Sequence, residues 1–121
     1  MAIELWKVPV APTALTRSPS FAVLPKRQCQ LSIEFEGNSG VVSNALLFEG
    51  VESFKCTYMA SCSAEMFNTA YGKLVRLGSS QWLAETQTAN SRRSPSELQH
   101  LMICFDDGPC YEFICTGFRV S

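Results

Sequence analysis

The most constraining feature of this sequence is a strict alternation of polar and apolar residues from Gln28 to Glu36. On an extended chain the apolar members share one face, and they are Cys29, Leu31, Ile33 and Phe35. Period 2 with one polar face is typical of an antiparallel strand at the surface of a sheet. Turn-forming residues follow at 37–40 (Gly-Asn-Ser-Gly), so we expect 41–48 to be the returning strand.

A turn closed over 37–40 also sets the register of this hairpin. It places Phe35 opposite Val42 and, further out, Cys29 opposite Phe48. The paired residues on that face are all apolar except Asn44. A slip of one residue would turn the apolar side chains to the polar face, so this agreement favours the register.

Further strands and an arm are predicted around the hairpin. Glu4–Val8 is a short strand candidate, and residues 53–59 alternate again, which predicts a third strand of the same kind. Residues 9–25 contain Pro9, Pro12, Pro19 and Pro25. Because proline lacks the amide that a central strand needs, we expect this segment to be a loop or an arm laid over the surface.

The period of the apolar residues changes after residue 60. Their spacing predicts a main helix from Met66 to Leu77, capped by Ser61 or Ser63 and followed by Gly78 as its C-terminal glycine. A second, shorter helix is expected over 80–89.

The last two predicted strands, 98–105 and 110–120, are joined by Asp106-Asp107-Gly108-Pro109. A four-residue loop places Phe105 opposite Cys110 and, further out, His100 opposite Cys115. Both faces of this hairpin are then apolar, which is typical of a central pair of strands covered on both sides. We expect helices to cover one side and a curled, barrel-like sheet the other.

Together these patterns predict one α+β domain over residues 1–121. It would contain an antiparallel, five- or six-stranded sheet that could close into a barrel-like shape. One main helix and a second short helix would be inserted before the C-terminal hairpin.

The composition argues against several classes of protein. A formal net charge of -1 lacks the basic excess of a dedicated nucleic-acid binder. Apolar runs stay well short of the roughly 18 residues of a membrane span, so we expect no membrane partner. Glu4 and Lys7 interrupt the apolar residues at the N-terminus, which is unlike a secretory signal and predicts a cytoplasmic protein.

The chain has six cysteines, without a CxxC pair. Cytosolic thiols stay reduced, so the sequence predicts free thiols that act as small apolar side chains, and no structural zinc site. His100 and Cys104 lie about 13 Å apart along a strand, which is too far to bind one ion. The sequence therefore predicts no metal site and no cofactor.

Two polar residues of the terminal hairpin are candidate functional residues. The predicted register surrounds Glu112 with apolar side chains, and a buried carboxylate needs a partner or takes up a proton. Such a group is a candidate functional site, the alternative being a strand-end glutamate that snorkels or pairs with an arginine. His100 opposite Cys115 would be the start of a nucleophile–base pair, the alternative being a core histidine bonded to a carbonyl.

Three functions fit these observations. The leading hypothesis is a non-enzymatic binding module that recognises a protein partner or associates with itself, through the loops at 9–25 and 91–97. The second is a protein that binds a small ligand in a pocket between sheet and helices, lined by Trp82, Tyr71, Phe113 and Glu112. The third is a small enzyme that uses Glu112 or the His100/Cys115 pair.

Overall fold

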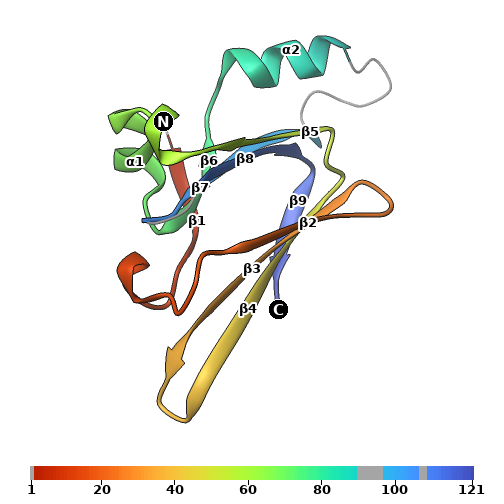
Figure 1. The fold of residues 1–121 in the computed structure, drawn as a ribbon. Helices are drawn as coiled ribbons and strands as arrows, with labels where there is room; N and C mark the ends of the chain where they lie inside the picture. Colours follow the sequence, from red (N-terminus) through yellow and green to blue (C-terminus); the bar gives the residue numbers. More distant parts are fainter. Residues whose placement is uncertain (1, 90–96, 107–108) are drawn as a thin grey trace.

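The computed structural model describes residues 2–89, 97–106 and 109–121. These residues form two antiparallel sheets that face each other, and two α-helices lie on the outer side of one sheet (Figure 1). The predicted α+β class with antiparallel strands is confirmed. The single curled sheet is not what forms: the strands divide between a five-stranded and a four-stranded sheet, and barrel closure is not seen among the described residues. The polar loop predicted at 91–96 and the turn residues Asp107 and Gly108 lie outside the described part of the chain.

The five-stranded sheet has the strand order β1-β6-β7-β8-β5. Its strands are β1 (Ala2–Lys7), β6 (Lys73–Leu77), β7 (Gln99–Cys104), β8 (Cys110–Cys115) and β5 (Ser53–Thr57). The four-stranded sheet has the order β2-β3-β4-β9. Its strands are β2 (Ser20–Leu24), β3 (Gln28–Gly37), β4 (Gly40–Glu49) and β9 (Gly117–Val120).

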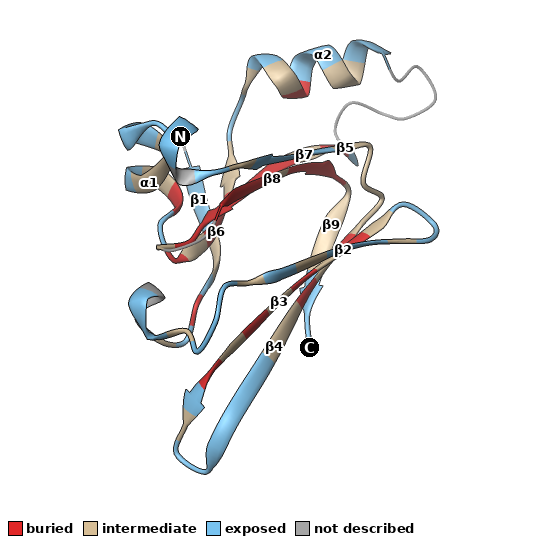
Figure 2. Ribbon diagram, viewed as in Figure 1, coloured by how far each residue is buried: buried red, intermediate tan, exposed pale blue. Residues whose placement is uncertain are grey.

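The β3–β4 hairpin forms in the predicted register. Phe35 pairs with Val42 and Cys29 with Phe48, and the alternating apolar residues of β3 are buried. The end of the hairpin near the turn is exposed, including Val41 and Val42 (Figure 2). Gly40 has a φ of +120°, a backbone conformation that L side chains rarely adopt, which explains the glycine at the end of this turn.

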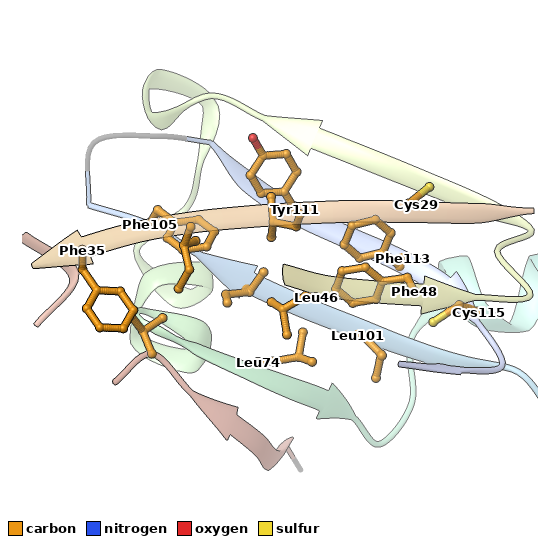
Figure 3. Close-up of a cluster of buried hydrophobic side chains, with 14 residues drawn as sticks. Cys29, Phe35, Leu46, Phe48, Leu74, Leu101, Phe105, Tyr111, Phe113 and Cys115 are labelled. Carbon is orange, nitrogen blue, oxygen red and sulfur yellow. The ribbon is translucent and has the colours of Figure 1, made fainter. Parts of the chain in front are cut away.

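The main core lies between the two sheets. Leu31, Leu46 and Phe48 project from the four-stranded sheet against Leu101, Phe113 and other residues of the five-stranded sheet (Figure 3). The rings of Phe48 and Phe113 stack with their centroids 3.8 Å apart and an interplanar angle of 14°. Both side chains are fully buried, so this pair joins the sheets at the centre of the molecule.

The predicted helix over 66–77 is wrong in its second half. Helix α1 covers only Ala64–Ala70, and the chain then turns at Gly72, whose φ is +69°, into strand β6. Leu74 enters the core between the sheets, whereas Val75 points to the other face and packs with the residues under α1. The neighbouring apolar residues Leu74 and Val75 therefore point to opposite faces of strand β6. The predicted cap is confirmed, because the Ser63 side chain accepts a hydrogen bond from the Met66 amide.

Two other segments differ from the prediction. The arm at 9–25 contains a 3₁₀ turn, Pro12–Ala14, and strand β2, which lies between Pro19 and Pro25 at the edge of its sheet, where flanking prolines are tolerated. The single strand predicted over 110–120 is two strands: β8 ends at Cys115, and β9 joins the other sheet beside β4.

The predicted register of the terminal hairpin is wrong by one residue. Cys104 pairs with Cys110, and His100 pairs with Ile114 rather than with Cys115. β7 ends at Cys104 and β8 starts at Cys110, so Phe105 is not paired and the connection is one residue longer than predicted. As a result Glu112 shares the helix-covered face with His100, and Cys115 points between the sheets. The prediction that β7 and β8 are covered on both faces is confirmed.

Candidate functional site

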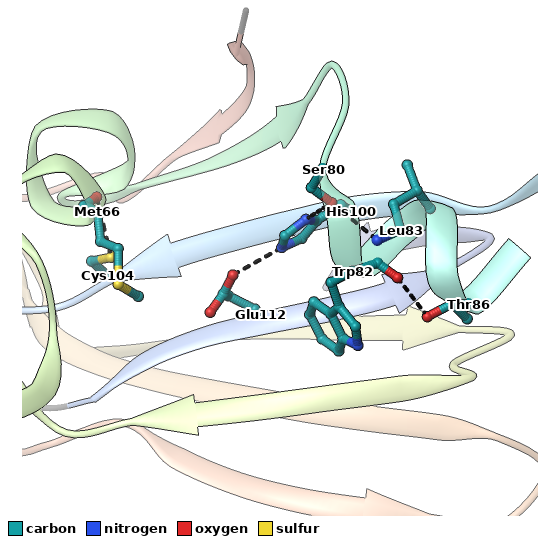
Figure 4. A network of polar contacts seen from close by, with 8 residues as sticks. All are labelled: Met66, Ser80, Trp82, Leu83, Thr86, His100, Cys104 and Glu112. Atoms are coloured by element: carbon teal, nitrogen blue, oxygen red, sulfur yellow. Dashed lines mark hydrogen bonds and ion pairs between the residues drawn. The ribbon is translucent and has the colours of Figure 1, made fainter.

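A chain of hydrogen bonds links the five-stranded sheet to the start of helix α2 (Gln81–Ala89). His100 Nε2 lies 2.9 Å from Glu112 Oε1, and His100 Nδ1 lies 2.8 Å from Ser80 Oγ (Figure 4). The side chain of His100 is 5% exposed and that of Glu112 is 13% exposed. The carboxylate that the sequence expects to need a partner therefore has one on the neighbouring strand.

The sequence produces this arrangement through strand register and a helix cap. His100 and Glu112 are diagonal neighbours on β7 and β8, since Met102 pairs with Glu112. Ser80 directly precedes α2, and its Oγ accepts the Leu83 amide hydrogen at 3.1 Å, as an N-cap does. The serine thus holds the helix and contacts the imidazole with the same oxygen.

The directions of these hydrogen bonds depend on the tautomer of His100. When Glu112 is ionised and His100 is neutral, Nε2 carries the ring proton and donates to the carboxylate, and Nδ1 accepts from the Ser80 hydroxyl. The hydrogen bonds then all run in one direction: the Leu83 amide donates to Ser80, Ser80 donates to His100, and His100 donates to Glu112. Each buried polar atom of the series has a partner, which offsets the cost of removing these groups from water.

Two further side chains complete the surroundings of this network. The Trp82 ring meets the His100 ring edge-on, with centroids 5.0 Å apart and an interplanar angle of 89°. Lys55, which pairs with Glu112 across β5 and β8, holds its Nζ 4.1 Å from the centre of the Trp82 ring. The lysine brings a positive charge to the edge of the five-stranded sheet beside this network.

Not all of the predicted site residues lie together. The structure joins His100, Glu112 and Trp82 on the helix-covered face. Phe113 stacks in the core between the sheets, and Tyr71 donates its hydroxyl hydrogen to Asp106 at 2.7 Å, which raises the pKa of Tyr71. Cys115 is fully buried on the opposite face from His100, and burial raises the pKa of its thiol to about 12. The His100/Cys115 pair does not form.

Ser80 and Lys55 are contributors that the sequence interpretation missed. Ser80 is the first residue of the predicted second helix, so its role as the N-cap could have been predicted from the sequence. Helix α2 begins at the next residue, as expected. Its contact with His100 depends on β6 running next to β7, where Leu77 pairs with His100. That neighbourhood was hidden because 73–77 was expected to be helical.

A second feature is a groove between the edge strands β2 and β5. Its volume is about 320 Å³, and its apolar lining includes Val23, Val51 and Phe54. At one end Arg27 forms an ion pair with Glu52, with 2.7 Å between Nη1 and Oε1. The centroid of the Phe21 ring lies 5.2 Å from that of the Phe54 ring, and Phe21 packs against the core between the sheets.

The described residues hold no cluster of three or more histidine, cysteine, aspartate or glutamate side chains arranged for a metal ion. Within the same ranges, no helix combines the length and apolar character that crossing a membrane requires. The six cysteines are free, and four of them are buried: Cys29, Cys104, Cys110 and Cys115. Comparison of the chain with protein-family models, with curated proteins and with solved structures gave no match.

Proposed function

We propose that this domain is a non-catalytic binding module that takes an extended segment of a partner protein along the edge strand β5. The observation that carries the proposal is the groove beside this edge. Among the described residues, β5 and β2 are the edge strands of their sheets, and no described strand pairs with the outer side of β5. The backbone donors and acceptors on that side are therefore available for pairing. An added strand would satisfy these groups, which is a common mode of peptide recognition.

The side chains around β5 suit such a strand. Phe54 is 42% exposed and Val23, on the facing edge strand, is 63% exposed. Successive residues of a strand point to opposite faces, so every second side chain of an added segment would enter the apolar groove. Burial of apolar side chains there would supply affinity, while the main-chain hydrogen bonds would set the alignment.

The charge on β5 favours a different protein over a second copy of this chain. Lys55 is the middle residue of β5, and two copies paired about a two-fold axis at that position would place their Lys55 side chains opposite each other. A lysine on an edge strand discourages such pairing. A partner segment with an acidic residue opposite Lys55, and apolar residues at alternate positions, fits the same edge.

A selection experiment tests this function. Short random peptides displayed on phage are selected on the purified domain, and the enriched peptides are measured by fluorescence polarisation. We expect alternating apolar residues with an acidic residue among them. Because Val23→Glu puts a carboxylate into the groove, it is expected to weaken binding by about tenfold or more.

Val41→Glu is the matched control. Val41 is 58% exposed, like Val23, but lies on the hairpin end of β4 and does not line the groove. It should leave binding unchanged. Equal binding to the Val23→Glu and Val41→Glu variants, or an enriched set without alternation, would show that the groove is not the binding surface.

A second candidate function is ester hydrolysis, which the order Ser80–His100–Glu112 favours. Ser80 Oγ would attack an ester carbonyl and pass its proton to His100 Nδ1, which would protonate the leaving alcohol. Water would then hydrolyse the acyl-serine. We rank this function second because Ser80 Oγ already caps α2 and Ser80 does not line the groove.

Labelling with a fluorophosphonate distinguishes the two functions. A nucleophilic Ser80 should gain a covalent adduct that mass spectrometry locates on its peptide, and Ser80→Ala should lose it while Ser79→Ala retains it. The binding-module proposal predicts no adduct on Ser80. It also predicts that Ser80→Ala lowers the free energy of unfolding by about 1 kcal/mol, because the N-cap is removed.

A further inference from the structure

Three thiols converge where the end of the β7–β8 hairpin meets the segment that leads into α1. Cys62 Sγ lies 3.2 Å from Cys110 Sγ and 3.3 Å from the Thr57 carbonyl oxygen. Cys104, which pairs with Cys110 across β7 and β8, has its Sγ 3.5 Å from the Met66 carbonyl oxygen. The cluster is separate from the groove and from the Ser80–His100–Glu112 network.

The three thiols differ in access. Cys104 and Cys110 are fully buried, and burial raises the pKa of both thiols, that of Cys104 to about 11. Cys62 is half-buried and stands between the 3₁₀ turn Met59–Ser61 and α1, outside any helix or strand. Of these three thiols, a reagent in solution therefore meets Cys62 first, and the Cys110 sulfur lies 3.2 Å from the Cys62 sulfur.

We propose that Cys62 and Cys110 are a thiol oxidation site that reacts with low-molecular-weight disulfides. The two sulfurs must approach each other by about 1 Å to reach bonding distance. Cys62 can supply this movement, since its backbone is not held in a helix or strand. The product would join the start of α1 to strand β8.

The reaction proceeds by two exchanges. The Cys62 thiolate attacks one sulfur of glutathione disulfide, forming a mixed disulfide and releasing one glutathione thiolate. Cys110 Sγ then attacks Cys62 Sγ, and its proton passes to the released thiolate. The second glutathione leaves as a thiolate, which takes up from water the proton that Cys62 lost on ionising. In total two cysteine thiols are oxidised, one disulfide is reduced to two glutathione thiols, and no other oxidant is needed.

Mass spectrometry of the oxidised protein tests this proposal. The reduced domain is incubated with glutathione disulfide, and free thiols are then alkylated before digestion. We expect the chain to lose two hydrogens and to yield a peptide pair linked through Cys62 and Cys110. Cys62→Ser should abolish the linked pair, whereas Cys29→Ser, at a buried thiol on β3, should leave it unchanged.

The possible outcomes separate clearly. A mixed glutathione disulfide that persists on Cys62, or a link from Cys62 to the exposed Cys56, would overturn the proposal. If dithiothreitol removes the Cys62–Cys110 link and a second incubation with glutathione disulfide forms the same link again, the result would support the proposal. Cys62→Ser keeps the test decisive even if a Cys110 variant fails to fold, because Cys62 is only half-buried.

Discussion

Raising the pH from 9 to 12 is expected to unfold this domain progressively. Burial raises the pKa of the Cys115 thiol to about 12, that of the Tyr111 hydroxyl to about 12 and that of the Cys104 thiol to about 11. All three side chains lie in the cores on either side of the five-stranded sheet. Ionisation of any of them inside the protein would place a charge among apolar side chains.

The direction of this effect follows from the raised pKa values. Well below pH 9, the ordinary pKa of a thiol, the groups are protonated in both the folded and the unfolded chain, so their full contribution to stability is present. Between about pH 9 and 11 the unfolded chain loses these protons while the folded chain largely keeps them. The free energy of unfolding therefore falls as the pH rises, by an expected 3 kcal/mol or more, roughly, over this range.

Urea unfolding at a series of pH values, with a reductant present and tryptophan fluorescence as the signal, measures this fall. Tyr111→Phe is the matched control, because it removes one titrating hydroxyl from a buried ring at little change in volume. Its stability should fall less steeply with pH than that of the unsubstituted chain. Constant stability from pH 8 to 11, or identical slopes for both proteins, would contradict the expectation.

The two hairpins show what the sequence could and could not determine. In β3 only one face is apolar, so a slip of one residue would expose Leu31 and Ile33. The alternation and the turn therefore allowed one register, and it is the observed one. In β7 and β8 both faces are apolar, so either register buries a similar set of side chains and the pattern could not distinguish them.

The error over 66–77 has a related cause. A short apolar run fits helical and strand periods equally well, and only the neighbours of β6 decide between them. Leu74 and Val75 are buried on opposite faces because one faces the second sheet and the other faces α1. The helix prediction hid the contact between Ser80 and His100, so the candidate site was found only in part.

Breaking the His100–Glu112 pair from one side is expected to destabilise the domain strongly. His100→Phe retains an aromatic ring next to Trp82 but leaves the Glu112 carboxylate without its hydrogen-bond donor. Glu112→Leu leaves the His100 N–H without an acceptor. Since both side chains are largely buried, each single change should lower the free energy of unfolding by about 3 kcal/mol.

The double variant His100→Phe/Glu112→Leu separates the loss of the hydrogen bond itself from the cost of leaving one buried polar group without a partner. With both partners replaced by apolar side chains, no unpaired charge or donor remains, so the loss should be clearly smaller than the sum of the two single losses. Glu112→Gln keeps an oxygen that can accept from Nε2, and it should cost less than Glu112→Leu. Urea unfolding of the variants measures these differences, and additive losses would show that the two residues do not interact.

The same pair explains why the terminal hairpin adopts the observed register. In the register shifted by one residue, Glu112 would face the core between the sheets, with Leu101 and Ile103, and His100 would remain on the helix-covered face. The carboxylate would then be buried without a donor, at a cost of several kcal/mol, whereas the apolar residues of both faces would be buried about equally well in either register. Hydrophobic burial alone leaves the two registers nearly equivalent in free energy, so the cost of separating His100 from Glu112 selects the observed one. A double variant with apolar residues at both positions should lose that selection while retaining much of its stability.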